Sequence, residues 1–169
     1  MKKFILYILI SLFSINIQAQ KKMITPPYLQ KGDTIAIVAT ARKNIEDNLQ
    51  PAISWLKNWG LEVVIGNTIG LDKDQLAGTD EQRAADFQTQ LDNPNIKAIW
   101  CVRGGYGTVR MIDLLDFTKF KQNPKWIVGF SDVTVLHSHL NTMGFQSIHG
   151  IMPVSTKASE EAKESLRKA

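Results

Sequence analysis

The sequence predicts an α/β protein, built as a layered, mostly parallel sheet with helices on both faces. Short apolar runs such as residues 34–39 (TIAIVA) and 124–129 (PKWIVG) lack the alternation of a half-exposed strand, so both of their faces should be covered. Between such runs lie segments whose apolar residues recur three and four positions apart, which is typical of amphipathic helices. Strict alternation of strands and helices favours parallel strands joined by right-handed crossovers, as in flavodoxin-like and Rossmann-like domains.

The order of the expected elements follows from the apolar runs and the turn residues between them. Strands are expected at residues 34–39, 61–65, 97–102, 124–129 and 145–149. Helices are expected at residues 44–59, 80–92, 106–115 and 132–143, and another should begin within the polar stretch 159–169. Gly60 marks the end of the first helix, and Thr79 begins the second with a capping arrangement.

The N-terminus has the pattern of a cleavable signal peptide. Lys2 and Lys3 precede an apolar run at residues 4–13, and residues 17–19 (IQA) form a cleavage site. The apolar run is shorter than the roughly 20 residues needed to span a bilayer, so no stable membrane anchor is expected. We therefore expect residues 1–19 to be removed and the mature protein, beginning near Gln20, to be periplasmic.

Residues 20–169 are expected to form one domain of ordinary size with its own core. The formal charge of +4 comes partly from lysines in or beside the leader, and no basic run is interleaved with aromatic residues, so nucleic-acid binding is not expected. The single cysteine, Cys101, excludes an intrachain disulfide and fits a buried core position. The three histidines lack the spacing of a zinc site, so no metal is expected.

A glycine-rich turn follows the third expected strand, with the sequence Arg103-Gly104-Gly105-Tyr106-Gly107. In sheets of this type, ligands bind beyond the carboxyl ends of the strands. Glycines allow backbone N–H groups to approach an anion closely. The turn matches neither GxGxxG nor GxxxxGK[ST]. It is therefore an ordinary tight turn, a phosphate loop, or an oxyanion site that needs a nucleophile nearby.

Ser131 is the candidate nucleophile. In the segment Gly129-Phe130-Ser131-Asp132-Val133-Thr134, a strand ends and a helix begins at once, which places Ser131 on a sharp turn that resembles a nucleophile elbow. The N–H of Asp132 and one from the glycine turn could then stabilise an oxyanion. The alternative is that Ser131 is an ordinary helix N-cap. Val133 replaces the second glycine of the α/β-hydrolase signature, so that family is not indicated.

A serine nucleophile needs a base, and none of the three histidines is convincing. His137 and His139 lie in the helix after Ser131, and His137 is expected to point away from the N-terminus of that helix. Both are interpreted as packing or surface residues. His149 lies at the correct edge of the sheet, where a lining or hydrogen-bonding role is expected.

Several segments together resemble one known family. The turn RGGYG followed by LLDF, the segment NPKWIVGFSDVTVLH and the segment SIHG are similar, in order and spacing, to the LD-carboxypeptidases, also called muramoyltetrapeptide carboxypeptidases. The segment PPYLQKGDTIAIVA fits the same family. The resemblance covers about residues 24–169, which is nearly all of the expected mature chain.

The resemblance implies a serine carboxypeptidase that cleaves murein tetrapeptides between the diamino acid and the terminal D-alanine, during recycling of the cell wall. It implies a Ser-His-Glu triad with Ser131 as nucleophile, and an oxyanion hole formed by main-chain donors at Asp132 and Gly105. It implies no metal or organic cofactor. The substrate pocket would be lined by Arg103, Gly104, Tyr106 and His149.

The sequence also departs from the family. Ala39-Thr40-Ala41 replaces the usual Ala-Pro-Ser after the first strand, and Ile151 replaces a usual proline, which changes the shape of the pocket. The family's catalytic Glu and His lie in a C-terminal domain that is absent from these 169 residues. Because a serine without its base is a poor nucleophile, this chain alone is expected to be nearly inactive. The missing C-terminal domain, from the same or another chain, is therefore the expected partner, and a homodimer is also compatible with the sequence.

Two other functions are kept as hypotheses. One is an immunity-type hydrolase that inactivates a peptide-nucleotide antibiotic, resembling the microcin immunity proteins, although export argues against it because such toxins act in the cytoplasm. The other is a catalytically dead module that binds murein peptides, in which the glycine turn and Ser131 only hold a peptide carboxylate.

Overall fold

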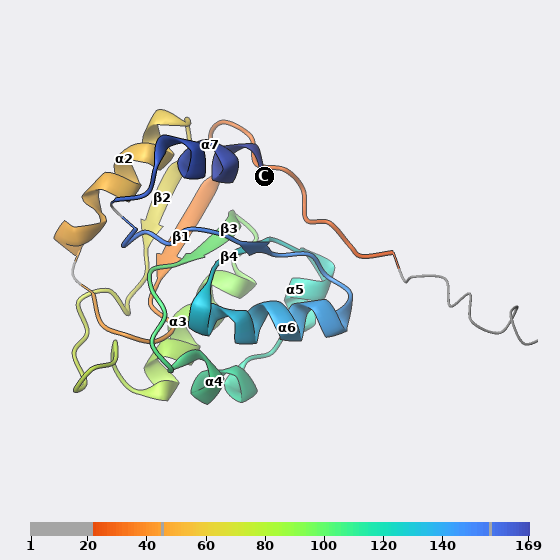
Figure 1. The fold of residues 1–169 in the computed structure, drawn as a ribbon. Helices are drawn as coiled ribbons and strands as arrows, with labels where there is room; N and C mark the ends of the chain where they lie inside the picture. The colour runs from red at the N-terminus through yellow and green to blue at the C-terminus, as the bar shows by residue number, and fades with distance from the viewer. Residues whose placement is uncertain (1–21, 45, 156) are drawn as a thin grey trace, which may run out of the picture.

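The computed structural model describes residues 22–44, 46–155 and 157–169 of the chain. A five-stranded sheet forms its centre, with the order β2-β1-β3-β4-β5 and parallel pairing throughout (Figure 1). The strands are β1 (Thr34–Val38), β2 (Glu62–Ile65), β3 (Ile96–Cys101), β4 (Trp126–Gly129) and β5 (Ile148–His149). The predicted α/β fold with a parallel sheet is confirmed. The expected signal peptide, residues 1–19, lies outside the described residues.

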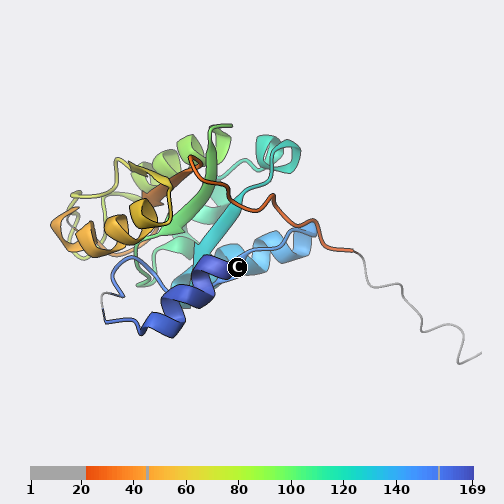
Figure 2. The same ribbon diagram turned by 90° about the horizontal axis from the view of Figure 1, so that it is seen from above.

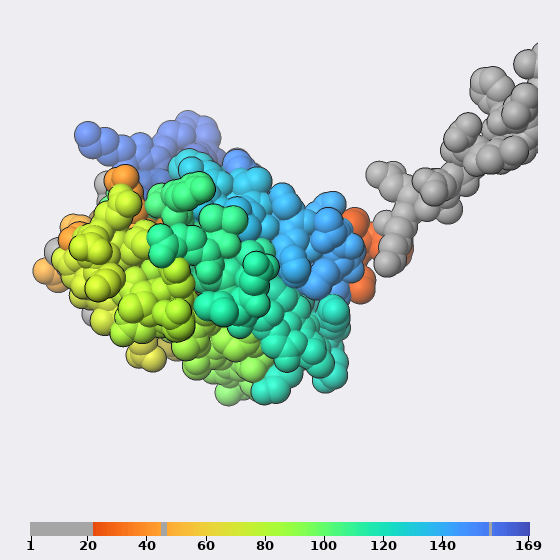
Figure 3. Space-filling view, turned by 90° about the horizontal axis from the view of Figure 1, so that it is seen from below, coloured from red at the N-terminus to blue at the C-terminus, as the bar shows by residue number. Residues whose placement is uncertain are grey.

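Helices cover both faces of the sheet, as predicted. On one face lie α2 (Gln50–Asn58) and α7 (Glu160–Lys168), which are nearest the viewer in Figure 2. The opposite face, seen in Figure 3, is covered by the remaining helices. These are α3 (Asp80–Asp92), α4 (Thr108–Met111), α5 (Thr118–Gln122) and α6 (Thr134–Met143).

Two hydrophobic clusters form because both faces of the sheet are buried. Along β1, Ala36 and Val38 belong to the cluster under α3 and α6, whereas Ile35 and Ile37 belong to the cluster under α2. Successive side chains of a strand point to opposite faces, so a continuous apolar run supplies both clusters. Cys101 is fully buried, as predicted, and burial raises the pKa of its thiol to about 12.

The strongest local signals gave the most accurate helix bounds. Helix α3 has the predicted bounds, and its capping box is formed by two bonds between Thr79 and Gln82. The expected helix at 44–59 begins instead with a 3-10 turn, η1 (Glu46–Leu49), before α2. The helix expected at 132–143 likewise begins with a 3-10 turn, η3 (Ser131–Val133), before α6.

The shortest elements differ more from expectation. The helix expected at 106–115 is divided into α4 and the 3-10 turn η2 (Ile112–Leu114), and α5 was not expected at all. The last strand is limited to β5, and Phe145 instead forms an isolated parallel bridge with Ile24. The Phe145 ring packs against Phe120, with ring centroids 5.0 Å apart. No helix in the described ranges is long and apolar enough to cross a bilayer.

A cavity of about 560 Å³ lies between α7 and the sheet, and Trp59, Trp100 and Trp126 are among its lining residues. Ile35, Trp126 and Ile148, which stand at or near the amino ends of their strands, also line it. The cavity is therefore reached from the edge of the sheet opposite to the carboxyl ends of the strands.

Lys125 is buried just before β4 and completes the end of α3. Its Nζ donates to the carbonyl oxygens of Gln90, at 3.0 Å, and Asn93, at 2.6 Å. These carbonyls lie at the C-terminal end of α3, where the helix cannot satisfy its own acceptors. Burial lowers the pKa of Lys125 to about 8.

Replacing Lys125 with methionine should therefore destabilise the fold. Lys125→Met keeps the length of the side chain but leaves helix-end carbonyls without a buried donor, so the free energy of unfolding should fall by about 1–3 kcal/mol in urea denaturation. Lys121→Met, at an exposed position in α5, is the control and should change stability by less than about 0.5 kcal/mol. Equal losses in both variants would contradict this role for Lys125.

Candidate active site

The carboxyl ends of the strands bring the candidate residues to one edge of the sheet. The glycine turn follows β3, Ser131 follows β4, and His149 ends β5, where it pairs in register with Gly129. In the sheet, β2 lies on one side of β1, and β3 lies on the other. The strand order therefore reverses between β1 and β3. Ligands of open α/β sheets bind at such a switch point.

Ser131 lies on a strained turn, as the elbow interpretation requires. Its φ is 59°, in the left-handed region that residues other than glycine rarely adopt, and its side chain is exposed. Phe130, and not Ser131, holds the N-cap position of η3, so Ser131 is not an ordinary N-cap. A Cβ at Gly129 would lie 2.9 Å from two methyl carbons of Val133, so glycine is required there.

The glycine turn touches the Ser131 turn directly. A Cβ added to Gly104 would lie 3.3 Å from both Ser131 Cβ and the backbone nitrogen of Asp132. Gly105, with φ 128°, and Tyr106, with φ 63° and 79% exposure, continue the turn in conformations that favour glycine. The two turns are therefore in contact.

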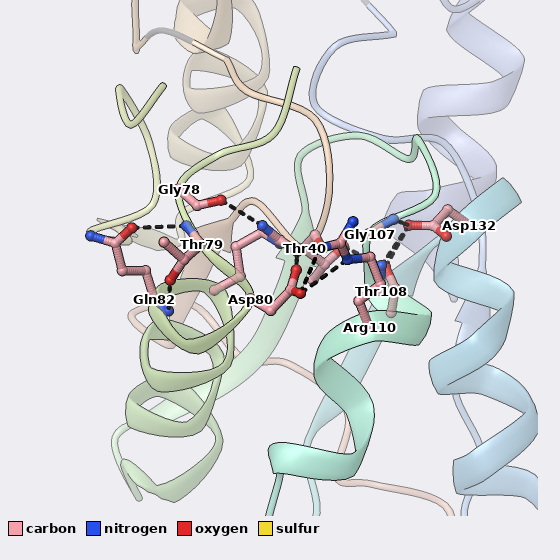
Figure 4. Close-up of polar contacts among 10 residues, drawn as sticks. Thr40, Gly78, Thr79, Asp80, Gln82, Gly107, Thr108, Arg110 and Asp132 are labelled. Carbon is pink, nitrogen blue, oxygen red and sulfur yellow. Dashed lines mark hydrogen bonds and ion pairs between the residues drawn. The ribbon is translucent and has the colours of Figure 1, made fainter. Parts of the chain in front are cut away.

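The side chain of Asp132 ties these two turns together, a role that the sequence analysis did not anticipate. Its Oδ2 accepts hydrogen bonds from Gly107 N at 3.1 Å, Thr108 N at 3.0 Å and Thr108 Oγ1 at 2.7 Å (Figure 4). These donors begin α4, which follows the glycine turn. The nearest sequence signal was the position of Asp132 directly after the proposed nucleophile, but the partner could be found only in three dimensions.

The hydrogen-bonded path continues from Thr108 to Thr40. The two hydroxyl oxygens are 2.9 Å apart and buried. An ionised carboxylate only accepts, so Thr108 donates to Asp132 and Thr40 donates to Thr108. Thr40 is the residue that replaces the proline usual in the resembling family, and a proline could not make this contact.

Buried Arg83 contacts the segment that contains Thr40. Its Nε donates to Thr40 O at 3.1 Å and its Nη1 to Gly78 O at 2.6 Å, and it forms an ion pair with Asp80. Asp80 also pairs with Arg110 of α4 at 2.9 Å. Burial alone would raise the pKa of Asp80, but its bonds to Arg110 and Arg83 outweigh this effect and lower it.

The histidines do not supply a base to Ser131 within the described residues. His137 reaches back to the turn, so the expectation that it points away from the helix N-terminus is wrong. Its Nε2 lies 2.9 Å from Gly129 O and its Nδ1 lies 2.8 Å from Ser147 Oγ. A carbonyl only accepts, so neutral His137 carries its proton on Nε2 and accepts from Ser147. Both ring nitrogens are thus engaged.

The other two histidines lie where they were expected. His139 packs against Phe117, with ring centroids 4.8 Å apart. His149 is exposed, and its ring centroid lies 6.2 Å from that of Phe130 beside Ser131. Arg103 is partly exposed, and its Nη1 lies 3.5 Å from Lys43 O.

Comparison with known proteins identifies the family. The family model described as the LD-carboxypeptidase N-terminal domain matches residues 35–150. The chain belongs to the LD-carboxypeptidase family. It is 36% identical over 123 residues to the murein tetrapeptide carboxypeptidase of Pseudomonas aeruginosa, an alignment that covers 72% of this chain and 39% of that protein.

Solved structures of the LD-carboxypeptidase family have the same fold. The muramoyltetrapeptide carboxypeptidase of Oxalobacter formigenes superposes with a TM-score of 0.71 at 33% identity, covering 80% of this chain and 47% of that one. The microcin C7 self-immunity protein MccF of Escherichia coli gives a TM-score of 0.77 at 24% identity, covering 86% and 46%. The chain spans about half the length of curated relatives that it matches.

Removing the Asp132 carboxylate should loosen this site. Asp132→Ala leaves the N–H groups of Gly107 and Thr108 without an acceptor, so the free energy of unfolding should fall by about 3 kcal/mol. Asp132→Asn keeps an acceptor oxygen and should lose less. Chemical denaturation of these variants, beside Asp113→Ala at an exposed position of η2, measures the difference. A loss in Asp132→Ala no larger than in Asp113→Ala would contradict the assignment.

The neutral state of His137 predicts a pH dependence of stability. Burial lowers the pKa of His137, and nearby His149 lowers it further. The hydrogen bond to Gly129 O raises the pKa, but by less. A lowered folded-state pKa means that the unfolded chain binds the proton first, so this stabilisation is present above about pH 6.5 and is lost as pH falls. The melting temperature should therefore fall between pH 7.5 and 5.5, and His137→Gln should flatten that fall. If the melting temperature of His137→Gln falls with pH as steeply as that of the parent protein, His137 is not the cause of the pH dependence.

Proposed function

We propose that this chain carries the nucleophile of an exported serine LD-carboxypeptidase that releases terminal D-alanine from murein tetrapeptides. The observation that carries the proposal is Ser131, exposed on a left-handed turn against Gly104. Family membership and the murein peptidases among the relatives support the substrate class. The leader-like pattern of residues 1–19 supports action in the periplasm.

In this mechanism, Ser131 Oγ attacks the carbonyl carbon of the diamino acid, and the oxyanion that forms is held by the N–H groups of Asp132 and Gly105. The C–N bond to D-alanine then breaks, the amine leaves with a proton, and an acyl-enzyme remains on Ser131. Water hydrolyses this ester and restores the hydroxyl. The general base is the histidine that the family resemblance places in the C-terminal domain. His137 does not take this role, because both of its ring nitrogens are engaged elsewhere.

The Asp132 contact supports this mechanism because the two proposed oxyanion donors come from different turns. One donor follows β4 and the other follows β3, and the carboxylate joins their turns through Gly107 and Thr108. Preorganised donors stabilise developing charge without reorganising during the reaction.

The test is release of D-alanine from a murein tetrapeptide. A protein of full family length that contains these residues should release it, and Ser131→Ala should lower kcat by about a thousandfold or more. Ser138→Ala, at an exposed position in α6, is the matched control and should keep full activity. The 169-residue chain alone should release almost none. Undiminished release by Ser131→Ala would refute the assignment of the nucleophile.

Two alternative functions give different results in the same experiment. An immunity-type hydrolase, suggested by the 31% identity to MccF over 111 residues, would turn over an acyl-sulfamoyl adenylate in preference to the tetrapeptide. A binding module without activity would retain tetrapeptide binding in Ser131→Ala, and a serine-directed covalent probe would fail to label the wild-type protein.

A further inference from the structure

Two arginines flank the point where the strand order of the sheet reverses. Arg42 lies in the segment after β1, and Arg103 lies in the segment after β3. Because β1 and β3 are neighbours whose onward connections diverge, the crevice beyond their carboxyl ends is the expected ligand position. Ser131 follows β4, the next strand along, so it lies at the same end of the sheet.

Arg42 lies against the glycine turn itself. A Cβ placed on Gly105 would lie 3.0 Å from Arg42 Nε and closer still to its Cγ and Cδ. The Arg42 backbone N–H also approaches the carbonyl oxygen of Gly104, at 3.5 Å. The side chain of Arg42 therefore lies across Gly105, the proposed second oxyanion donor.

The charged groups described near Arg42 have partners of their own. Its neighbour Lys43 pairs with Asp72 at 2.6 Å, and the Asp132 carboxylate is occupied by the start of α4. Among the described residues, no carboxylate forms an ion pair with Arg42 or Arg103. An exposed guanidinium beside a nucleophile, with no acid committed to it, favours an anionic ligand group.

We infer that Arg42 binds the terminal carboxylate of the substrate and so restricts cleavage to the last residue of the peptide. The inference rests on the proposed function. In a peptide cleaved at its last bond, only the nitrogen and Cα of the leaving residue separate its carboxylate from the scissile carbonyl. A carboxylate binder must therefore adjoin the oxyanion site, as Arg42 does. The planar guanidinium also matches a carboxylate in two-point contact.

The test compares a murein tetrapeptide that ends in a free carboxylate with the same peptide ending in an amide. In the protein of full family length, Arg42→Gln should raise KM for the free acid about 10- to 100-fold while kcat changes little, as expected for loss of a charge-assisted bond. Turnover of the amide, which is poor at the start, should not change. Arg42→Lys should restore part of the loss, and Lys43→Gln, which removes the neighbouring paired cation, should have no effect.

Binding to the Ser131→Ala form keeps the inference separate from the proposed reaction. Preference for the free acid over the amide, lost in Arg42→Gln, supports the inference even where no D-alanine is released by the wild-type protein. Equal weakening of both peptides would show a structural role and overturn it. Equal binding of acid and amide by the parent protein, or no binding of either, would overturn it as well. Adenosine monophosphate is tested as a third ligand that carries a phosphate in place of a carboxylate. If Arg42→Gln weakens binding of adenosine monophosphate but not of the free-acid peptide, the carboxylate assignment is overturned as well.

Discussion

The carboxylate of Asp132 accepts hydrogen bonds from the backbone of Gly107 and Thr108, which belong to a different strand–helix connection from its own. A parallel sheet brings the ends of its strands to one edge, but it does not fix how the turns beyond them meet. Here, a shift of either turn would leave buried N–H groups without an acceptor, at a cost of about 1–3 kcal/mol each. The contact between Gly104 and Ser131 depends on this constraint.

The hydrogen bonds that begin at Asp132 continue from the edge of the sheet through further polar groups, each of which has a partner. Asp132 is linked through Thr108 to Thr40, whose carbonyl oxygen accepts from Arg83, and Arg83 is in turn paired with Asp80. The path thus runs from the Asp132 carboxylate through two neutral hydroxyls and the Thr40 carbonyl to the Arg83–Asp80 ion pair. Such a path is rigid because each member loses a buried partner if another moves. Ser131 and Tyr106 adopt left-handed backbone conformations beside this path. Such strained conformations persist only where the surrounding structure determines them.

Features encoded in contiguous residues could be predicted from the sequence, whereas contacts between distant segments could not. Helix α3 has its predicted bounds because a capping box and an apolar stripe specify it locally. The short helix α5 has no side-chain cap and was missed. The elbow at Ser131 followed from a strand, a turn and a helix in sequence. The bonds of Asp132 and His137 join residues from 8 to 25 positions away, so only the fold could reveal them.

The polar groups at this edge fall into two sets, and the difference between them bears on function. The first set is satisfied within the domain: Asp132 by α4, Lys43 by Asp72, and His137 by Gly129 and Ser147. The second set is exposed and includes the Ser131 hydroxyl, the Arg42 guanidinium and the aromatic ring of Tyr106. A nucleophile, a cation and an aromatic surface are what a peptide with a free carboxyl end would contact. Because the first set is satisfied within the domain, the backbone that carries the second set needs no ligand to hold its geometry.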